Sequence, residues 1–121
     1  MLFRSLFAKV VRREGFEALT SESVEGGLAR LAQDAPRLAL VLLDVRLPHV
    51  DGRVFRACQL AEAAWAVVPT VIVTGLELGV NDLDRLQPAA WLRKPASFLQ
   101  LRDALHTHAR WPGGQVRAAA S

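Results

Sequence analysis

The stretch Leu38-Ala39-Leu40-Val41-Leu42-Leu43-Asp44 decides the fold of this chain. Six consecutive apolar residues are typical of a strand that is buried on both faces, and one carboxylate follows at its carboxyl end. Such strands occur in parallel α/β sheets, whose ligands bind at the edge formed by the carboxyl ends of the strands. Asp44 is therefore the first candidate for a functional residue.

Two further polar residues follow apolar runs downstream. Thr74 comes directly after Val71-Ile72-Val73, and Lys94 follows Trp91-Leu92-Arg93 and precedes a proline. Because the carboxyl ends of parallel strands meet at one edge of a sheet, we expect the carboxylate, the hydroxyl and the ammonium group to converge there. The sequence thus predicts one site built from Asp44, Thr74 and Lys94.

The rest of the chain alternates between helical and strand patterns. Apolar residues at helical spacing predict helices over residues 2–13, 24–32, 51–64, 81–86 and 98–105, and short apolar runs predict strands over 16–20, 38–44, 67–73 and 89–92. Strict alternation predicts an α/β fold with a doubly wound parallel sheet and helices on both faces. We expect one domain over residues 2–110 and a tail or linker over 111–121, where prolines and glycines end the pattern.

Composition narrows the class of protein. The 121 residues, 51% of them apolar and 22% charged, are typical of one globular domain. The net charge of +3 comes from scattered basic residues, so we expect no nucleic-acid partner. No apolar run approaches the ~20 residues that span a bilayer, so we expect no membrane partner. A single cysteine, Cys58, excludes an internal disulfide and favours a reducing, cytoplasmic location.

Taken together, residues 40–52, 71–75 and 91–95 resemble the receiver domain of bacterial two-component response regulators. The resemblance covers roughly residues 2–109, and the spacings of 30 residues from Asp44 to Thr74 and 20 from Thr74 to Lys94 are of the kind this family shows. It implies a flavodoxin-like fold and a phosphorelay role in signalling, and it implies that the chain is not an enzyme.

The resemblance also assigns a role to each matched residue. Asp44 corresponds to the phosphoacceptor aspartate, Thr74 to the switch hydroxyl, Lys94 to the lysine of the Lys-Pro pair, and Trp91 to the aromatic switch position. The Asp44 carboxylate and the backbone carbonyl of Arg46 correspond to Mg²⁺ ligands. The implied partner is a histidine kinase or a phosphotransfer protein. The alternative is a degenerate receiver that serves as a phosphorylation-independent interaction or dimerisation module.

One departure from the family pattern is large. Receivers carry an acidic pair at the end of a first strand, and here no acidic residue precedes Glu14, so both the pair and its strand are missing. In the strand order 2-1-3-4-5 that strand is central. Losing about five buried strand side chains removes on the order of 10 kcal/mol, which equals the stability of a typical domain. We therefore expect weak Mg²⁺ binding and a sheet that something else must complete.

Three explanations for the missing strand stay open. The chain could lack its native start, the strand over 16–20 could pair directly with 38–44, or another segment could fill the gap. That segment could come from a second subunit or from the tail over 115–119. An unfilled position in the sheet favours a homodimer.

Other enzyme classes fit less well. A phosphatase of the haloacid-dehalogenase type also uses a strand-end aspartate, but it needs a second acid two residues later, where this chain has Arg46. The chain contains neither a Gly-x-Ser-x-Gly elbow nor a phosphate-binding Walker loop.

Overall fold

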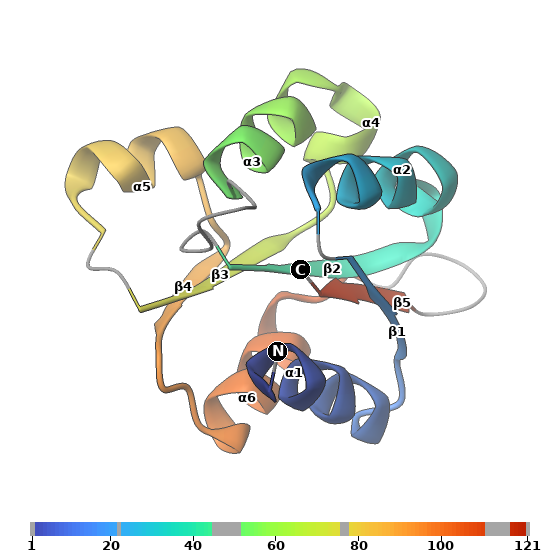
Figure 1. Cartoon of the computed structure of the whole chain (residues 1–121), viewed down its shortest axis with the longest axis vertical. Helices are drawn as coiled ribbons and strands as arrows, with labels where there is room; N and C mark the ends of the chain where they lie inside the picture. Colours follow the sequence, from blue (N-terminus) through green and yellow to red (C-terminus); the bar gives the residue numbers. More distant parts are fainter. Residues whose placement is uncertain (1, 22, 45–51, 76–77, 111–116, 121) are drawn as a thin grey trace.

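The computed structural model describes residues 2–21, 23–44, 52–75, 78–110 and 117–120. They form one parallel sheet with helices on both faces (Figure 1). In chain order the elements are α1 (Leu2–Arg13), β1 (Glu17–Thr20), α2 (Val24–Asp34), the 3₁₀ helix η1 (Ala35–Arg37), β2 (Leu38–Leu43), α3 (Gly52–Ala61), α4 (Ala63–Ala66), β3 (Thr70–Thr74), α5 (Val80–Leu86), β4 (Ala90–Arg93), α6 (Phe98–His108) and β5 (Arg117–Ala120). Within these ranges, no helix combines the length and apolar character needed to cross a bilayer.

Within the described residues the sheet has five strands in the order β1-β5-β2-β3-β4, and every neighbouring pair is parallel. The predicted doubly wound parallel α/β sheet is confirmed. The four predicted strands are all present, and the helix predicted over 51–64 is divided into α3 and α4. The last strand of the chain occupies the position that the first strand takes in the order 2-1-3-4-5.

The strand β5 fills the gap that the sequence left open. Ala119 pairs with Leu19 of β1 on one side and with Val41 of β2 on the other, so β1 and β2 both keep a hydrogen-bonding neighbour (Figure 1). Residues 117–120, which we expected to belong to a tail or linker, therefore lie inside the sheet. Because the chain completes its own sheet, the reason for expecting a homodimer disappears.

Arg110 holds the end of α6 against the beginning of β2. Its backbone N–H donates to the carbonyl of Ala39 at 2.9 Å, and its guanidinium donates to the carbonyls of Leu38 at 2.9 Å and Ala35 at 2.6 Å. Arg117, where β5 begins, pairs with Leu38. Arg110, just after α6, and Arg117, at the start of β5, therefore both lie beside the first residues of β2. From this position β5 can run parallel to β2.

Two apolar cores lie on the two faces of the sheet. Alternate residues of β2 divide between them, with Leu40 and Leu42 in one core and Val41 and Leu43 in the other. The first core contains residues of α1 and α6, and the second contains residues of α2, α3 and α5 (Figure 1). All six residues of β2 are buried, as a strand covered on both faces requires.

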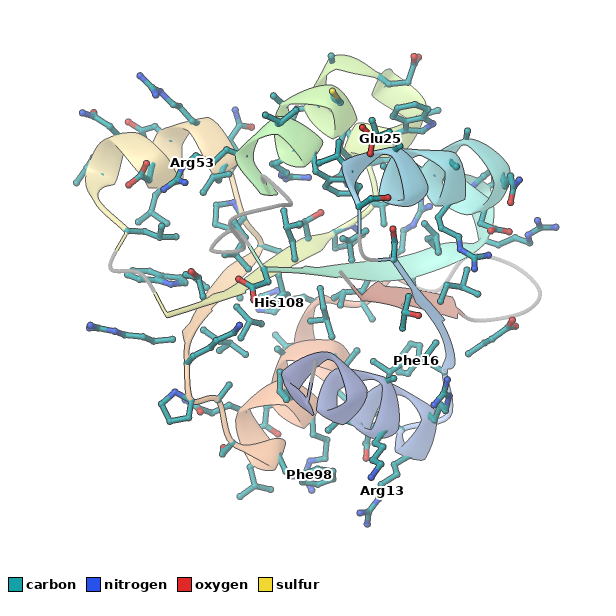
Figure 2. All side chains as sticks on the ribbon, in the orientation of Figure 1. Arg13, Phe16, Glu25, Arg53, Phe98 and His108 are labelled. Carbon is teal, nitrogen blue, oxygen red and sulfur yellow. The ribbon has the colours of Figure 1, made fainter. Side chains whose placement is uncertain are left out.

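The two helices on one face are also joined by polar contacts. The guanidinium carbon of Arg13 in α1 lies 5.1 Å from the ring centre of Phe98 in α6, which is a cation–π contact; both residues are labelled in Figure 2. Near the same helices, His106 Nε2 lies 2.5 Å from a carboxylate oxygen of Glu14. These contacts fix α1 and α6 relative to each other on the face that covers the first core.

Candidate functional site

Asp44 and Lys94 meet at the carboxyl edge of the sheet. Asp44 follows β2 and Lys94 follows β4, and the order β2-β3-β4 puts the end of β3 between them. The Lys94 ammonium nevertheless reaches the Asp44 carboxylate and forms an ion pair with Oδ2. The two side chains are only 7% and 14% exposed, for Asp44 and Lys94 respectively. A pair so shielded from water interacts more strongly than a surface pair does.

Thr74 ends the intervening strand, and its backbone is hydrogen-bonded to that of Lys94. The backbone N–H of Lys94 donates to the carbonyl of Thr74 at 2.9 Å, and the preceding residue, Arg93, pairs with Thr74 in the sheet. Thr74 is completely buried. The structure thus brings together at one edge of the sheet the three residues that the sequence singled out.

Trp91 lies apart from this ion pair. It sits in the middle of β4, pairs with Ile72 of β3, and packs against the second core, which α2, α3 and α5 cover. Its indole Nε1 is buried and, among the residues that the structure describes, has no hydrogen-bond partner. A buried donor without a partner costs about 1–3 kcal/mol of folding free energy. A movement of the Trp91 ring that gave its N–H an acceptor would therefore stabilise the protein.

The described residues do not fit a strong Mg²⁺ site. Mg²⁺ prefers six oxygen ligands in octahedral geometry, including at least one carboxylate. In the described ranges no three His, Cys, Asp or Glu residues lie close enough together to hold a metal ion, and the Asp44 carboxylate is already paired with Lys94. The strand beside β2 has the sequence Arg-Ala-Ala-Ala, without an acid, and its Ala120 pairs with Leu42, two residues before Asp44. The predicted ligand Arg46 lies outside the described residues.

Sequence reasoning missed a buried polar network beneath α3. Arg56 donates from Nη1 to Thr70 Oγ1 at 3.0 Å, and the Thr70 hydroxyl donates to Gln59 Oε1 at 3.2 Å. Arg56 also donates from Nε to the carbonyl of Leu86 at 2.7 Å and from Nη2 to that of Gln87 at 2.9 Å. Burial lowers the pKa of Arg56. The sequence did contain a signal for this network. Arg56 and Gln59 lie on the same face of α3 as the buried Phe55, so their positions in the helix predict that they are buried as well.

The chain is similar to known proteins in its structure, whereas its sequence matches no family model and no curated protein. Chemotaxis protein CheY4 of Vibrio cholerae has a TM-score of 0.78 at 19% identity and covers 89% of this chain and 90% of its own. A sensor protein from Polaromonas sp. JS666 has a TM-score of 0.76 at 23% identity, covering 87% and 85%.

A third similar structure is that of a metal-bound response regulator. The Mn²⁺-bound form of response regulator Rcp1 has a TM-score of 0.69 at 21% identity and covers 85% of this chain and 84% of its own. CheY-like receiver domains thus align with about 88% of the chain. The resemblance that the motifs indicated is confirmed at the level of the fold. The chain therefore has the fold of response-regulator receiver domains.

Proposed function

We propose that this chain is a receiver module that accepts a phosphoryl group on Asp44 from a histidine kinase or a phosphotransfer protein. The observation that carries the proposal is the shielded ion pair of Asp44 and Lys94, next to the buried Thr74 at the carboxyl edge of the sheet. A carboxylate, a cation and a hydroxyl at one edge are the groups that phosphoryl transfer to a carboxylate needs.

In the proposed reaction a carboxylate oxygen of Asp44 attacks the phosphorus of a phosphohistidine. The new O–P bond forms as the N–P bond breaks, and the partner's imidazole nitrogen leaves with the electron pair and takes up a proton. Negative charge spreads over three phosphoryl oxygens during the transfer. The Lys94 ammonium, already beside Asp44, would move its pairing to one of these oxygens, and the Thr74 hydroxyl would donate to another.

The conformational output would involve Trp91. Its buried indole N–H has no partner within the described part of the chain, so the resting arrangement carries a polar cost that a shift of the ring could remove. Trp91 lies on β4 and packs against the core beneath α5, so its movement would alter the surface formed by β4 and the flanking helices. That surface is the proposed binding face for a downstream partner.

The rival function is a degenerate receiver that binds partners without being phosphorylated. One observation favours it: the described residues provide no carboxylate cluster that could hold a metal ion. Weak Mg²⁺ binding remains a prediction for both functions, and phosphorylation is predicted to be slow in the first and absent in the second. A homodimer also remains a proposal, but the missing strand no longer supports it, because β5 fills that position in the sheet.

Acetyl phosphate labelling followed by intact-mass measurement separates the two functions. The chain is incubated with acetyl phosphate, with and without millimolar Mg²⁺, and a gain of one phosphoryl group is expected at Asp44. The variant Asp44→Asn should lose that gain. Asp34→Asn is the matched control, because Asp34 is equally buried and is paired with Arg37 at 2.9 Å far from the edge. No gain in the unaltered chain under either condition would favour the degenerate receiver.

A further inference from the structure

The strand β5 holds a central position in the sheet with a sequence that strands disfavour. Residues 117–120 pair with β1 on one side and with β2 on the other (Figure 1). Their sequence is Arg-Ala-Ala-Ala, whereas strands are enriched in Val, Ile, Thr and aromatic residues and depleted in alanine. Local sequence and fold normally agree, and a conflict between them is expected at functional sites. The position between β1 and β2 is thus filled by a strand with little preference for it.

The pairing of β5 with β2 is also irregular. Against β1, the strand β5 pairs residue by residue over 17–20. Against β2, the register shifts between Leu38 and Leu40, so Ala39 has no partner in β5. The carbonyl of Ala39 accepts instead from the backbone N–H of Arg110 at 2.9 Å. A bulge of this kind interrupts the ladder locally, so β5 does not use the full length of the β2 edge.

The surroundings of this position require an apolar occupant. On the β2 side, Leu40 and Leu42 belong to the first core and Val41 to the second. On the β1 side, Ala18 packs against the first core and Leu19 against the second. Paired residues of neighbouring strands face the same side of a sheet, so successive side chains of an occupant would face the two cores in turn. A segment that binds there must be extended and apolar along its whole length.

From the weak strand preference of β5, its interrupted pairing and the two cores beside it, we infer that the position between β1 and β2 is a docking site for an extended apolar segment of another protein. The strand β5 is then an intramolecular occupant that such a segment displaces. A segment rich in Val and Ile would bind the same two rows of backbone groups with a stronger strand preference. This inference goes beyond the receiver function and does not depend on phosphorylation of Asp44.

The connection of β5 to the rest of the chain sets the affinity to expect. Residues 111–116 join it to the end of α6, and a short tether gives an effective concentration in about the millimolar range. A displacing segment must overcome this advantage through its own strand preference. The β5 strand of a second copy has the same sequence and no tether, so it does not compete at ordinary protein concentrations.

The test is an amide NMR titration of the full chain with the peptide Lys-Lys-Val-Ile-Val-Ile-Val-Lys-Lys, whose lysines keep it in solution. Saturable shifts are expected at residues 17–20 and 38–43, with an apparent dissociation constant of roughly 0.1–1 mM. Hydrogen exchange at the amides of 118–120 should become faster, because β5 leaves the sheet. The control peptide has proline at the central valine and should not bind, because proline cannot donate to a ladder. Absence of shifts at millimolar peptide would overturn the inference.

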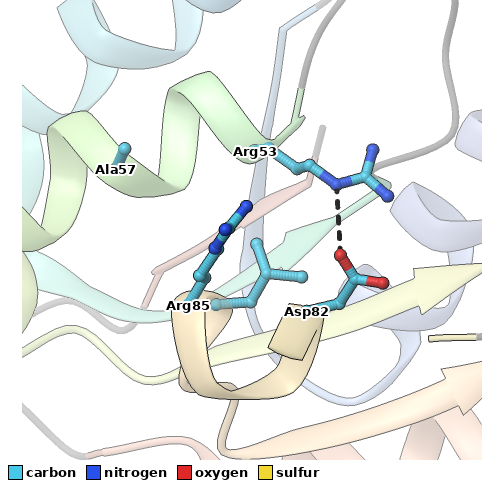
Figure 3. Close-up of a pocket in the computed structure, with 5 residues that line it drawn as sticks. Arg53, Ala57, Asp82 and Arg85 are labelled. Atoms are coloured by element: carbon cyan, nitrogen blue, oxygen red, sulfur yellow. Dashed lines mark ion pairs between the residues drawn. The ribbon is translucent and has the colours of Figure 1, made fainter. Parts of the chain in front are cut away.

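Two other places could take up an apolar peptide, and the titration distinguishes them. In the described sheet β4 lies at an edge, with β3 on one side. A cavity of about 340 Å³ lies between α3 and α5, where Arg53 and Asp82 face each other (Figure 3). Neither place includes a residue of β1 or β2 among its described members. Shifts confined to 90–93, or to the residues around the cavity, would therefore refute docking between β1 and β2.

Substitutions in β5 should change the affinity for the peptide in opposite directions. Ala119→Pro removes a ladder donor from β5, so the peptide should bind about tenfold more tightly and should raise the melting temperature of this variant more than that of the unaltered chain. Ala119→Val raises the strand preference of β5 and should weaken peptide binding about threefold. Ala63→Pro, in α4, is the control and should leave the affinity unchanged. The valine variant also serves as the test if the proline variant does not fold, and an affinity unaffected by either substitution would refute displacement of β5.

Discussion

Replacing Ala119 by proline tests whether β5 completes the sheet. Ala119 pairs with Leu19 in β1 and with Val41 in β2. Proline has no N–H, so one inter-strand hydrogen bond worth about 1 kcal/mol is lost. The carbonyl that accepted it stays inside the sheet without a donor, at a further cost of about 1–3 kcal/mol. The expected loss in the free energy of unfolding is therefore roughly 2–4 kcal/mol.

A loss of this size is large for a domain of 121 residues, whose total stability is about 5–15 kcal/mol. We expect Ala119→Pro to lower the melting temperature by about 10 °C and to lower the urea midpoint in proportion. Both are measured by circular dichroism at 222 nm. The midpoint should not change with protein concentration, because the strand comes from the same chain.

The control is Ala63→Pro, which places the same residue at the first position of α4. The preceding residue, Glu62, has φ −112° and ψ 116°, the extended conformation that a following proline favours. This variant should change stability by less than about 0.5 kcal/mol. If Ala119→Pro unfolds at the same midpoint as the unaltered chain, β5 does not lie between β1 and β2. A midpoint that rises with concentration would mean that the strand is exchanged between copies.

Two further substitutions test the core. Arg56→Met removes three buried donors and leaves the carbonyls of Leu86 and Gln87 at the end of α5 without these partners. The free energy of unfolding, measured in urea, should therefore fall by about 2–4 kcal/mol. A decrease below about 1 kcal/mol would contradict the hydrogen-bond network. Gly27→Ala would put a Cβ 2.7 Å from the ring of Phe55 and should cost about 1–3 kcal/mol. Gly79→Ala meets nothing within 4 Å and serves as its control, so equal thermal stabilities of the two variants would refute the predicted clash.

The sequence by itself determined the parallel α/β architecture and the residues of the candidate site. A strand buried on both faces must be apolar along its whole length, so 38–43 could be recognised without coordinates, and Asp44 marks where that strand ends. Parallel strands place their carboxyl ends at one edge, so the proximity of Asp44, Thr74 and Lys94 followed from the strand assignment alone. The ion pair of Asp44 and Lys94 bears out that expectation.

Only the tertiary structure decided which segment completes the sheet. The four residues of β5 read Arg-Ala-Ala-Ala, a sequence with little strand preference of its own, and they follow a stretch rich in proline and glycine. Their conformation comes from the unpaired backbone of β1 and β2, which is a property of the assembled sheet and not of the local sequence. The same holds for the partners of Arg56, because the carbonyls of Leu86 and Gln87 lie 30 and 31 residues away in the sequence and only the packing of α5 against α3 brings them together.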